Sequence, residues 1–342
     1  MLWLSRMRRV LYWVIPVALL ALVFRQIEWP TLVRHLQNTN PWWVLAGIVY
    51  YPLVVLIGAL RWHVLLRRCF GPEARPALAV RHYWIGLAIG LFGPASVGWD
   101  AYRVVAAARR LGHVASQVAI LVFEKLAALL ICVSLIVLLY PFLDVAASPM
   151  LRTILEGASV LLLASMVALA LMNRLGLGSG PTGAMAWAAA LLAAFLKRLA
   201  AAGGRDPAGA GAALDLGALM KPFVGWRPML ATGGLSLAIQ VAAAAGNQLF
   251  FRALGYDLPF TVNLFVLPIL FIAFLLPISF GSLGIREGSY VLLYGQFGVP
   301  AEVALAVSAF NLAGMMLNCA VGGAWLFLHG FDRGGEAIRR PT

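Results

Sequence analysis

Two charged residues interrupt a long apolar stretch of this chain. Glu124 and Lys125 lie inside the run Val114–Leu139, within the sequence VAILVFEKLAALLICVSLIVLL. A charge at the centre of a bilayer costs about 2.5–3.5 kcal/mol on insertion scales, so it needs a partner or a function. Lys125 can extend toward the inner membrane surface, whereas Glu124 needs a cationic partner, for which Arg103 and Arg286 are the candidates. A buried ion pair or a site for a charged ligand would meet this requirement.

Two further charged pairs follow sequences that match as P-x-S-x-G. Asp100 and Arg103 come after PASVG and are three residues apart, which places them on one face of a helix. Arg286 and Glu287 come after PISFG and are adjacent. Each pair could hold a charged headgroup, or could be an ion pair at the start of a short helix, where the helix dipole favours an acid such as Glu287. The sequence leaves both interpretations open.

Other chemistry finds little support in the sequence. The five histidines and three cysteines are scattered without metal-ligand spacing, and no Walker loop, GxSxG or HExxH motif occurs. We therefore expect no catalytic residue, no metal and no cofactor. Amide side chains within the apolar runs are expected to form hydrogen bonds between helices; they are Gln240, Asn247, Gln248, Asn311 and Asn318.

The elements that must position these residues are membrane-spanning helices. Of the 342 residues, 62% are hydrophobic and 11% are charged, whereas a soluble domain has about 25% charged residues. A bilayer span requires roughly 20 apolar residues. Long apolar runs recur at Val10–Phe24, Trp42–Leu60, Val114–Leu139, Leu151–Met172, Met229–Phe251, Val262–Ile278 and Val303–Leu328. The chain is therefore predicted to be an all-α polytopic membrane protein.

The net charge of +13 fits membrane topology better than nucleic-acid binding, because the basic residues lie between apolar runs. Cytoplasmic loops carry an excess of Lys and Arg. Basic groups precede the first run, follow the second, precede the third, and occur near residues 197–227 and at the C-terminus. Placing them in the cytoplasm predicts about six full transmembrane helices with both termini inside. Arg61 belongs to the group expected after the second run.

Two apolar segments do not fit as ordinary spans and are predicted to be re-entrant helical hairpins. His82–Val97 has arginines on both sides and should open to the inside, whereas Val262–Ile278 lies in a less basic neighbourhood and should open to the outside. The predicted breaks are Pro94, Ser96 and Gly98 in the first hairpin and Pro277, Ser279 and Gly281 in the second. Span, hairpin and span then occur twice in opposite orientations. Such an inverted-topology repeat, with interrupted helices at equivalent positions, is typical of transporters.

The whole chain, 1–342, is predicted to be one integral membrane domain. It divides into a first repeat at about 41–142, a cytoplasmic connection at about 173–227 and a second repeat at about 228–330. A short helix after each break should end at Gly112 and Gly298. Backbone groups and charges at the hairpin tips are costly to leave in lipid. We therefore expect the tips to meet near the midplane, with Asp100 and Arg286 lining a common pocket.

At GPASVGWDAYR, LVFEKL and LPISFGSLGIREG the chain resembles the transmembrane domain of the lysylphosphatidylglycerol synthase family, a flippase-like domain. The likeness covers about residues 10–330. It implies functional roles, by matching motif, for Arg61, Asp100, Arg103, Glu124, Arg286 and Glu287. Lys125, Ser282 and Trp99 depart from the family pattern of Arg, Gly and Gly, and Lys at the first of these positions loses bidentate geometry.

The resemblance implies lipid movement, and we expect a lipid transporter of the bacterial inner membrane with no soluble aminoacyltransferase domain in this chain. The expected substrate is a phosphate-containing phospholipid, glycolipid or polyprenyl-linked lipid, with arginines on the phosphate and carboxylates on cationic parts of the headgroup. A membrane-embedded lipid or glycolipid transferase is an alternative, disfavoured by the shortage of catalytic groups. An accessory subunit of an envelope-lipid glycosyltransferase is another. An envelope-lipid synthesising enzyme is a candidate partner, homo-oligomerisation stays open, and no nucleic-acid partner is expected.

Overall fold

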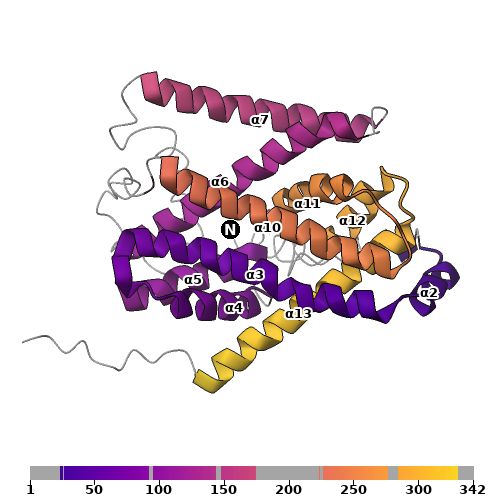
Figure 1. Ribbon diagram of the computed structural model, residues 1–342, viewed down its shortest axis with the longest axis horizontal. Coiled ribbons are helices and arrows are strands. Elements are labelled where there is room, and N and C mark those ends of the chain that lie inside the picture. The colour runs from indigo at the N-terminus through magenta and orange to yellow at the C-terminus, as the bar shows by residue number, and fades with distance from the viewer. Residues whose placement is uncertain are drawn as a thin grey trace, which may run out of the picture.

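The computed structural model describes residues 24–25, 27–91, 95–143, 148–174, 223, 226–275 and 284–329, and within these ranges it contains helices and no strand. The helices are α2 (Trp29–Gln37), α3 (Pro41–Phe70), α4 (Pro76–Leu91), α5 (Ala95–Leu111), α6 (Val114–Leu139), α7 (Pro149–Arg174), α10 (Trp226–Ala253), α11 (Phe260–Leu275), α12 (Ile285–Gly295) and α13 (Ala301–His329). They form an elongated bundle (Figure 1). The all-α prediction is confirmed for the described part of the chain.

Several predictions concern residues outside the described ranges. These residues are nearly all of the first predicted span, most of the predicted cytoplasmic connection at about 173–227, and four of the predicted break residues, Pro94, Pro277, Ser279 and Gly281. Ser96 and Gly98 lie in the first turn of α5.

Four helical segments are long and apolar enough to cross a membrane. They are Pro41–Glu73, Val114–Phe142, Trp226–Ala253 and Ala301–Leu328. Many of their large apolar side chains face outward, such as Trp42 at 75% exposure and Phe327 at 89%, which is unfavourable in water and favourable in lipid. The predicted run Leu151–Met172 forms α7, which is not among the four. A count of six spans stays a prediction.

Helix α3 continues well beyond the predicted end of the second span at Leu60. Trp62, Leu65 and Leu66 supply apolar residues at a helical spacing and are all buried. The helix ends where Gly71 adopts φ +62°, a conformation that favours glycine. Arg61 therefore lies inside the helix and is 6% exposed, so its predicted place among the loop arginines is wrong.

The helices follow one order twice: long, short, short, long. The first set is α3 to α6 and the second is α10 to α13. The two sets run in opposite directions. The backbone N–H of Asn40, just before α3, donates to the carbonyl of Ala253 at the end of α10, at 2.8 Å. Figure 1 shows that α6 and α13, the last helices of the two sets, also run in opposite directions.

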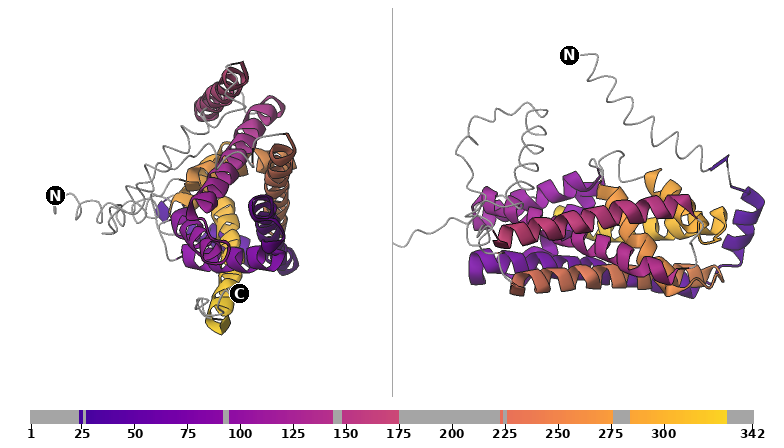
Figure 2. Two further views of the ribbon diagram at one scale, coloured as in Figure 1. Left: turned by 90° about the vertical axis from the view of Figure 1, so that its left-hand side faces the viewer. Right: turned by 90° about the horizontal axis from the view of Figure 1, so that it is seen from above.

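Contacts between the two sets are also matched. Helix α3 packs on α10, its counterpart, while α4 packs on α13 and α11 packs on α6. Outside the sets, α2 packs on α13 and α7 packs on α6, and the end-on view in Figure 2 shows α7 lying on the outside of the bundle. In each set, the first short helix thus packs on the last long helix of the other set.

Short helix pairs stand where the hairpins were predicted. The first arm, α4, begins at Pro76 rather than His82. After the helices α5 and α12, Gly112 and Gly298 have φ of +73° and +74°, which confirms the predicted glycine stops. Re-entry of these helix pairs into a bilayer stays a prediction.

Glycines let helices of this bundle approach one another closely. Gly86 and Gly90 on α4 lie under Trp99 of α5, and a Cβ on Gly90 would be 2.8 Å from that of Trp99. On α13, a Cβ on Gly322 would overlap the backbone carbonyl of Trp84 in α4, whereas one on Gly323 would meet open space. Small residues at such crossings are typical of membrane helices.

The neighbours Gly322 and Gly323 provide a matched test of the α4–α13 contact. We expect Gly322→Ala to lower the free energy of unfolding by about 1–3 kcal/mol, because a backbone carbonyl cannot move aside as a side chain can. Gly323→Ala should be neutral or slightly stabilising, since alanine favours helix over glycine. Thermal unfolding of both variants in detergent measures the difference; equal midpoints would contradict the close approach.

Candidate functional site

Five charged side chains form one buried cluster between α3, α5 and α6. Arg61 Nη2 lies 2.8 Å from Glu124 Oε1, and Arg103 Nη1 lies 3.2 Å from Glu124 Oε2. Arg103 Nη2 lies 2.6 Å from Asp100 Oδ1, and Lys125 Nζ lies 2.9 Å from Asp100 Oδ2. We call Arg61, Asp100, Arg103, Glu124 and Lys125 the charged cluster. It joins four of the six predicted headgroup residues.

Helical geometry assigns each acid its partners. Asp100 and Arg103, three apart on α5, pair with each other as their spacing predicts. Adjacent residues on a helix project about 100° apart. Glu124 on α6 therefore faces the two arginines while Lys125 reaches Asp100. The expectation that Lys125 extends to the membrane surface is wrong, because a carboxylate lies within reach.

Glu124 is 1% exposed and has two cationic partners. Arg103 was one of the predicted partners and is confirmed. Arg286, the other, pairs instead with Glu287. Arg61 was overlooked as a partner, because the second apolar run was expected to end before it. Removing one member of a buried pair leaves an uncompensated charge, which costs about 3–5 kcal/mol.

Aromatic rings hold Arg103 from three sides. Its guanidinium carbon lies 5.2 Å from the ring centroid of Trp62, 5.0 Å from Tyr83 and 5.3 Å from Trp99. A cation over an aromatic face is stabilised by the quadrupole of the ring, most strongly where water is excluded. We call these three residues the aromatic cage. No sequence pattern predicts this cage, because its rings come from α3, α4 and α5.

A cavity of about 360 Å³ opens beside the charged cluster. Arg61, Arg103, Glu124 and Lys125 line one end of it. Aromatic and aliphatic side chains line much of the rest, among them Phe250, Leu267, Leu270, Phe271 and Phe274. The cavity thus combines a charged end with an apolar wall.

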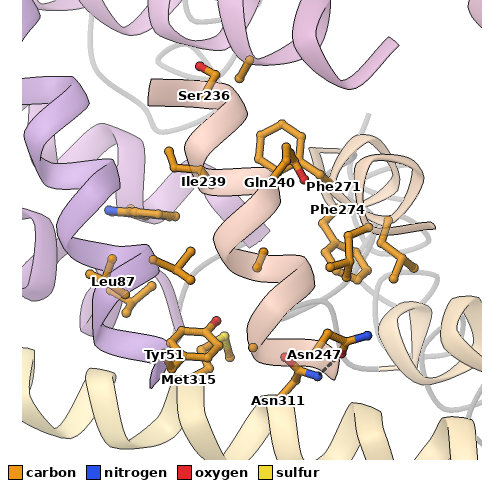
Figure 3. A pocket seen from close by; sticks show the side chains of 18 of the residues that line it. Tyr51, Leu87, Ser236, Ile239, Gln240, Asn247, Phe271, Phe274, Asn311 and Met315 are labelled. Atoms are coloured by element: carbon orange, nitrogen blue, oxygen red, sulfur yellow. Dashed lines mark hydrogen bonds between the residues drawn. The ribbon is translucent and has the colours of Figure 1, made fainter. Parts of the chain in front are cut away.

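Helix α10 runs along this cavity. Figure 3 shows Ser236, Ile239, Gln240 and Asn247 projecting from α10 into it, with Asn311 on α13 hydrogen-bonded to Asn247. Ser236 Oγ accepts a hydrogen bond from Arg61 Nη1 at 2.9 Å, so it marks the charged end. Asn247 is eleven residues later, or about 16 Å along the helix. Neutral amides therefore mark the far end.

Both short helix pairs reach the cavity. Leu91 and Leu275, which end α4 and α11, are both lining residues. The predicted hairpin tips follow these residues and lie outside the described ranges, so their meeting at one site stays a prediction. Neither Asp100 nor Arg286 is among the described lining residues, so the prediction for these two side chains is wrong. Both oxygens of Asp100 are engaged by Arg103 and Lys125 instead.

Arg286 and Glu287 form a separate pair at the start of α12. Arg286 Nη2 lies 2.7 Å from Glu287 Oε1, and Glu287 Oε2 accepts a hydrogen bond from the backbone N–H of Gly284 at 2.7 Å. Glu287 thus caps the helix, which is the structural interpretation left open by the sequence.

The predicted amide hydrogen bonds are confirmed in the described bundle. Asn247 Nδ2 donates to Asn263 Oδ1 at 2.8 Å and to the Tyr294 hydroxyl at 2.7 Å, and Asn247 Oδ1 accepts from Asn311 at 2.7 Å. Gln240 donates to the sulfur of Cys132, Gln248 to the carbonyl of Leu258, and Asn318 accepts from the indole of Trp84. Asn263 and Tyr294 were not predicted as members of this network.

In the part of the chain that the structure describes, no three His, Cys, Asp or Glu side chains lie close enough together to bind one metal ion. The charged cluster has two carboxylates, and all four of their oxygens accept from Arg or Lys. The arrangement therefore leaves no carboxylate oxygen without a partner, whereas its guanidinium and ammonium groups retain further N–H donors.

The importance of Glu124 can be tested against an exposed pair of the same chain. Glu124→Gln should lower the free energy of unfolding by about 3–5 kcal/mol, since it leaves two buried arginines without their shared counter-ion. Glu156→Gln, in the exposed Arg152–Glu156 pair, should unfold close to wild type. Thermal unfolding in detergent compares them, and Glu124→Ala should be worse than Glu124→Gln. Wild-type stability of Glu124→Gln would contradict the buried network.

Comparison with known proteins identifies one family. No curated protein and no solved structure matches the chain. The family model described as lysylphosphatidylglycerol synthase TM region matches residues 9–313, which include every member of the charged cluster and the aromatic cage. Together with the apolar helices, this match identifies a membrane protein. Because the match spans most of the 342 residues, the chain belongs to the lysylphosphatidylglycerol synthase TM region family.

Proposed function

We propose that this protein moves a phosphate-containing lipid across the membrane, with the headgroup held at the charged end of the cavity. One observation carries the proposal. Arg61 and Arg103 both line the cavity, although they are only 6% and 2% exposed. Arg61 donates one hydrogen bond from Nη1 to Ser236 and one from Nη2 to Glu124, and each of these nitrogens carries a second N–H group. A ligand that brings several acceptor oxygens would engage such donors.

Phosphate is the group that these donors suit best. A guanidinium presents donors in a planar fork that matches phosphate oxygens, and it keeps its charge in an apolar site. Arg61 is already oriented by Ser236 and Glu124, and Arg103 by Glu124, Asp100 and the aromatic cage. Such preorganisation lowers the entropic cost of binding a headgroup.

The apolar wall supports a lipid rather than a soluble phosphate as the substrate. Leu267, Leu270, Phe271 and Phe274 of α11 line the same cavity as the two arginines. An acyl or prenyl chain could lie against this wall while its phosphate stays at the charged cluster. Because both carboxylates of the cluster are engaged in ion pairs, we propose movement of the lipid without a covalent step.

The architecture supports transport by an inverted-topology repeat. The two helix sets run in opposite directions and pack through matched contacts. We propose that α4–α5 enters a bacterial inner membrane from the cytoplasmic side and α11–α12 from the opposite side, with both termini cytoplasmic and about six full spans. Exchange of the lipid between the two faces would then be a relative movement of the two sets around the cavity. An envelope-lipid synthesising enzyme could supply the lipid.

Transport can be measured with fluorescent phospholipid in vesicles. Full-length protein should carry inner-leaflet fluorescent lipid to the outer leaflet, so that an added membrane-impermeant quencher removes the remaining fluorescence faster than in protein-free vesicles. Arg61→Lys keeps the charge but loses the fork, so movement should slow on the order of tenfold. Arg152→Lys changes an exposed residue on α7 in the same way and should match wild type. Wild-type vesicles no faster than empty ones would refute transport, and an unaffected Arg61→Lys variant would refute the site.

Orientation can be tested with single cysteines at two exposed positions. Glu73 follows α3 and Asp257 follows α10, so the inverted repeat places them on opposite faces of the membrane. With Cys69 replaced by Ser, Asp257→Cys should react with an impermeant maleimide in intact cells, and Glu73→Cys should react only after lysis. Labelling of both from the same side would contradict the inverted repeat.

A further inference from the structure

The charge balance of the cavity restricts what headgroup it can take. Three cations and two carboxylates make up the charged cluster, which leaves one positive charge. Asp100 uses one oxygen for Arg103 and the other for Lys125, and both oxygens of Glu124 accept from arginine. Of the described lining residues, Glu124 alone is acidic. No carboxylate of the described cavity remains for a cationic group of the ligand.

We infer that the cavity selects a lipid whose headgroup is anionic overall, with a phosphate and neutral polar groups but no ammonium group, and that Lys125 determines this selectivity. The inference rests on the proposed function, since it specifies the substrate of the same site. It differs from the sequence-based expectation that Asp100, Glu124 and Glu287 would contact cationic parts of a headgroup. All three carboxylates have internal partners.

A phosphate monoanion matches the cluster in charge. It would neutralise the single excess positive charge and accept hydrogen bonds from the cationic side chains that line the cavity, which are Arg61, Arg103 and Lys125. An ammonium group would instead add a second uncompensated positive charge in an apolar site, where electrostatic interactions are strong. The remaining polar lining is uncharged, including Tyr50, Tyr51, Gln240, Asn247 and Asn311. Such side chains suit the hydroxyl groups of a glycerol or a sugar.

Lys125 controls the balance because it is the cation least engaged by the cluster. It lines the cavity, is 24% exposed, and has one carboxylate partner, Asp100, with the Trp99 ring 5.9 Å away. The two arginines are more buried and hold Glu124 between them. Neutralising Lys125 would make the cluster neutral and leave Asp100 Oδ2 without its partner. An ammonium group of a ligand could then take the place of Lys125 Nζ.

Native mass spectrometry of the delipidated full-length protein can test this selectivity. Phosphatidylglycerol, phosphatidylethanolamine and lysylphosphatidylglycerol with identical acyl chains are added together in equal amounts. Wild type should bind phosphatidylglycerol on the order of tenfold more than either amine-bearing lipid. Lys125→Gln should remove most of this preference. Lys125→Arg, which keeps the charge, should retain it and shows whether the position tolerates substitution.

Arg152→Gln is the matched control, because it removes the same charge from the exposed Arg152–Glu156 pair outside the cluster and should keep the wild-type preference. Equal binding of the three lipids by wild type, or an unchanged preference in Lys125→Gln, would overturn the inference. Excess glycerol 1-phosphate should not displace the lipid; displacement at comparable concentration would mean that a free phosphate is the occupant. Selective binding without lipid movement in vesicles would refute transport and leave the selectivity intact.

Discussion

The carboxylate of Glu124 accepts hydrogen bonds from two guanidinium groups, Arg61 on α3 and Arg103 on α5, inside an apolar bundle. None of these charges could be buried alone, since the desolvation of an isolated ion exceeds what packing returns. The pairing therefore fixes the distance between α3, α5 and α6. It also leaves donors rather than acceptors unengaged beside the cavity, which gives the site its electrostatic character.

The packing around this network combines very small residues with very large ones. Gly86 and Gly90 remove bulk from α4 so that Trp99 can approach it, and Trp99 with Trp62 and Tyr83 surrounds Arg103. The short pair α4–α5 is thus attached to the charged cluster through the aromatic cage. Any movement of this helix pair would displace the rings around Arg103. The geometry of the site is therefore coupled to the arrangement of the helices.

The two helix sets have matched contacts but different chemistry at their centres. In the first set, charges meet at Glu124, whereas in the second set neutral groups meet at Asn247, which bonds to Asn263, Tyr294 and Asn311. Since α10 lines the cavity from Ser236 to Asn247, the cavity runs from a charged end to a neutral one. This gradient arises because the two helix sets carry different polar side chains at their centres.

Several features could be predicted from the sequence. They are the helical membrane class, the third apolar run, which matches α6 from Val114 to Leu139, the glycine stops after α5 and α12, and the need of Glu124 for a cation. The length of an apolar run, the conformational preference of glycine and the cost of a buried charge are local properties that can be read from the sequence. Other features depend on how the helices pack. Packing places Arg61 and Arg103 against Glu124 and Lys125 against Asp100. It also brought Trp62, Tyr83 and Trp99 around Arg103 and placed Glu287 as a helix cap. Those outcomes depend on distances between helices far apart in the chain, and no local pattern encodes such distances.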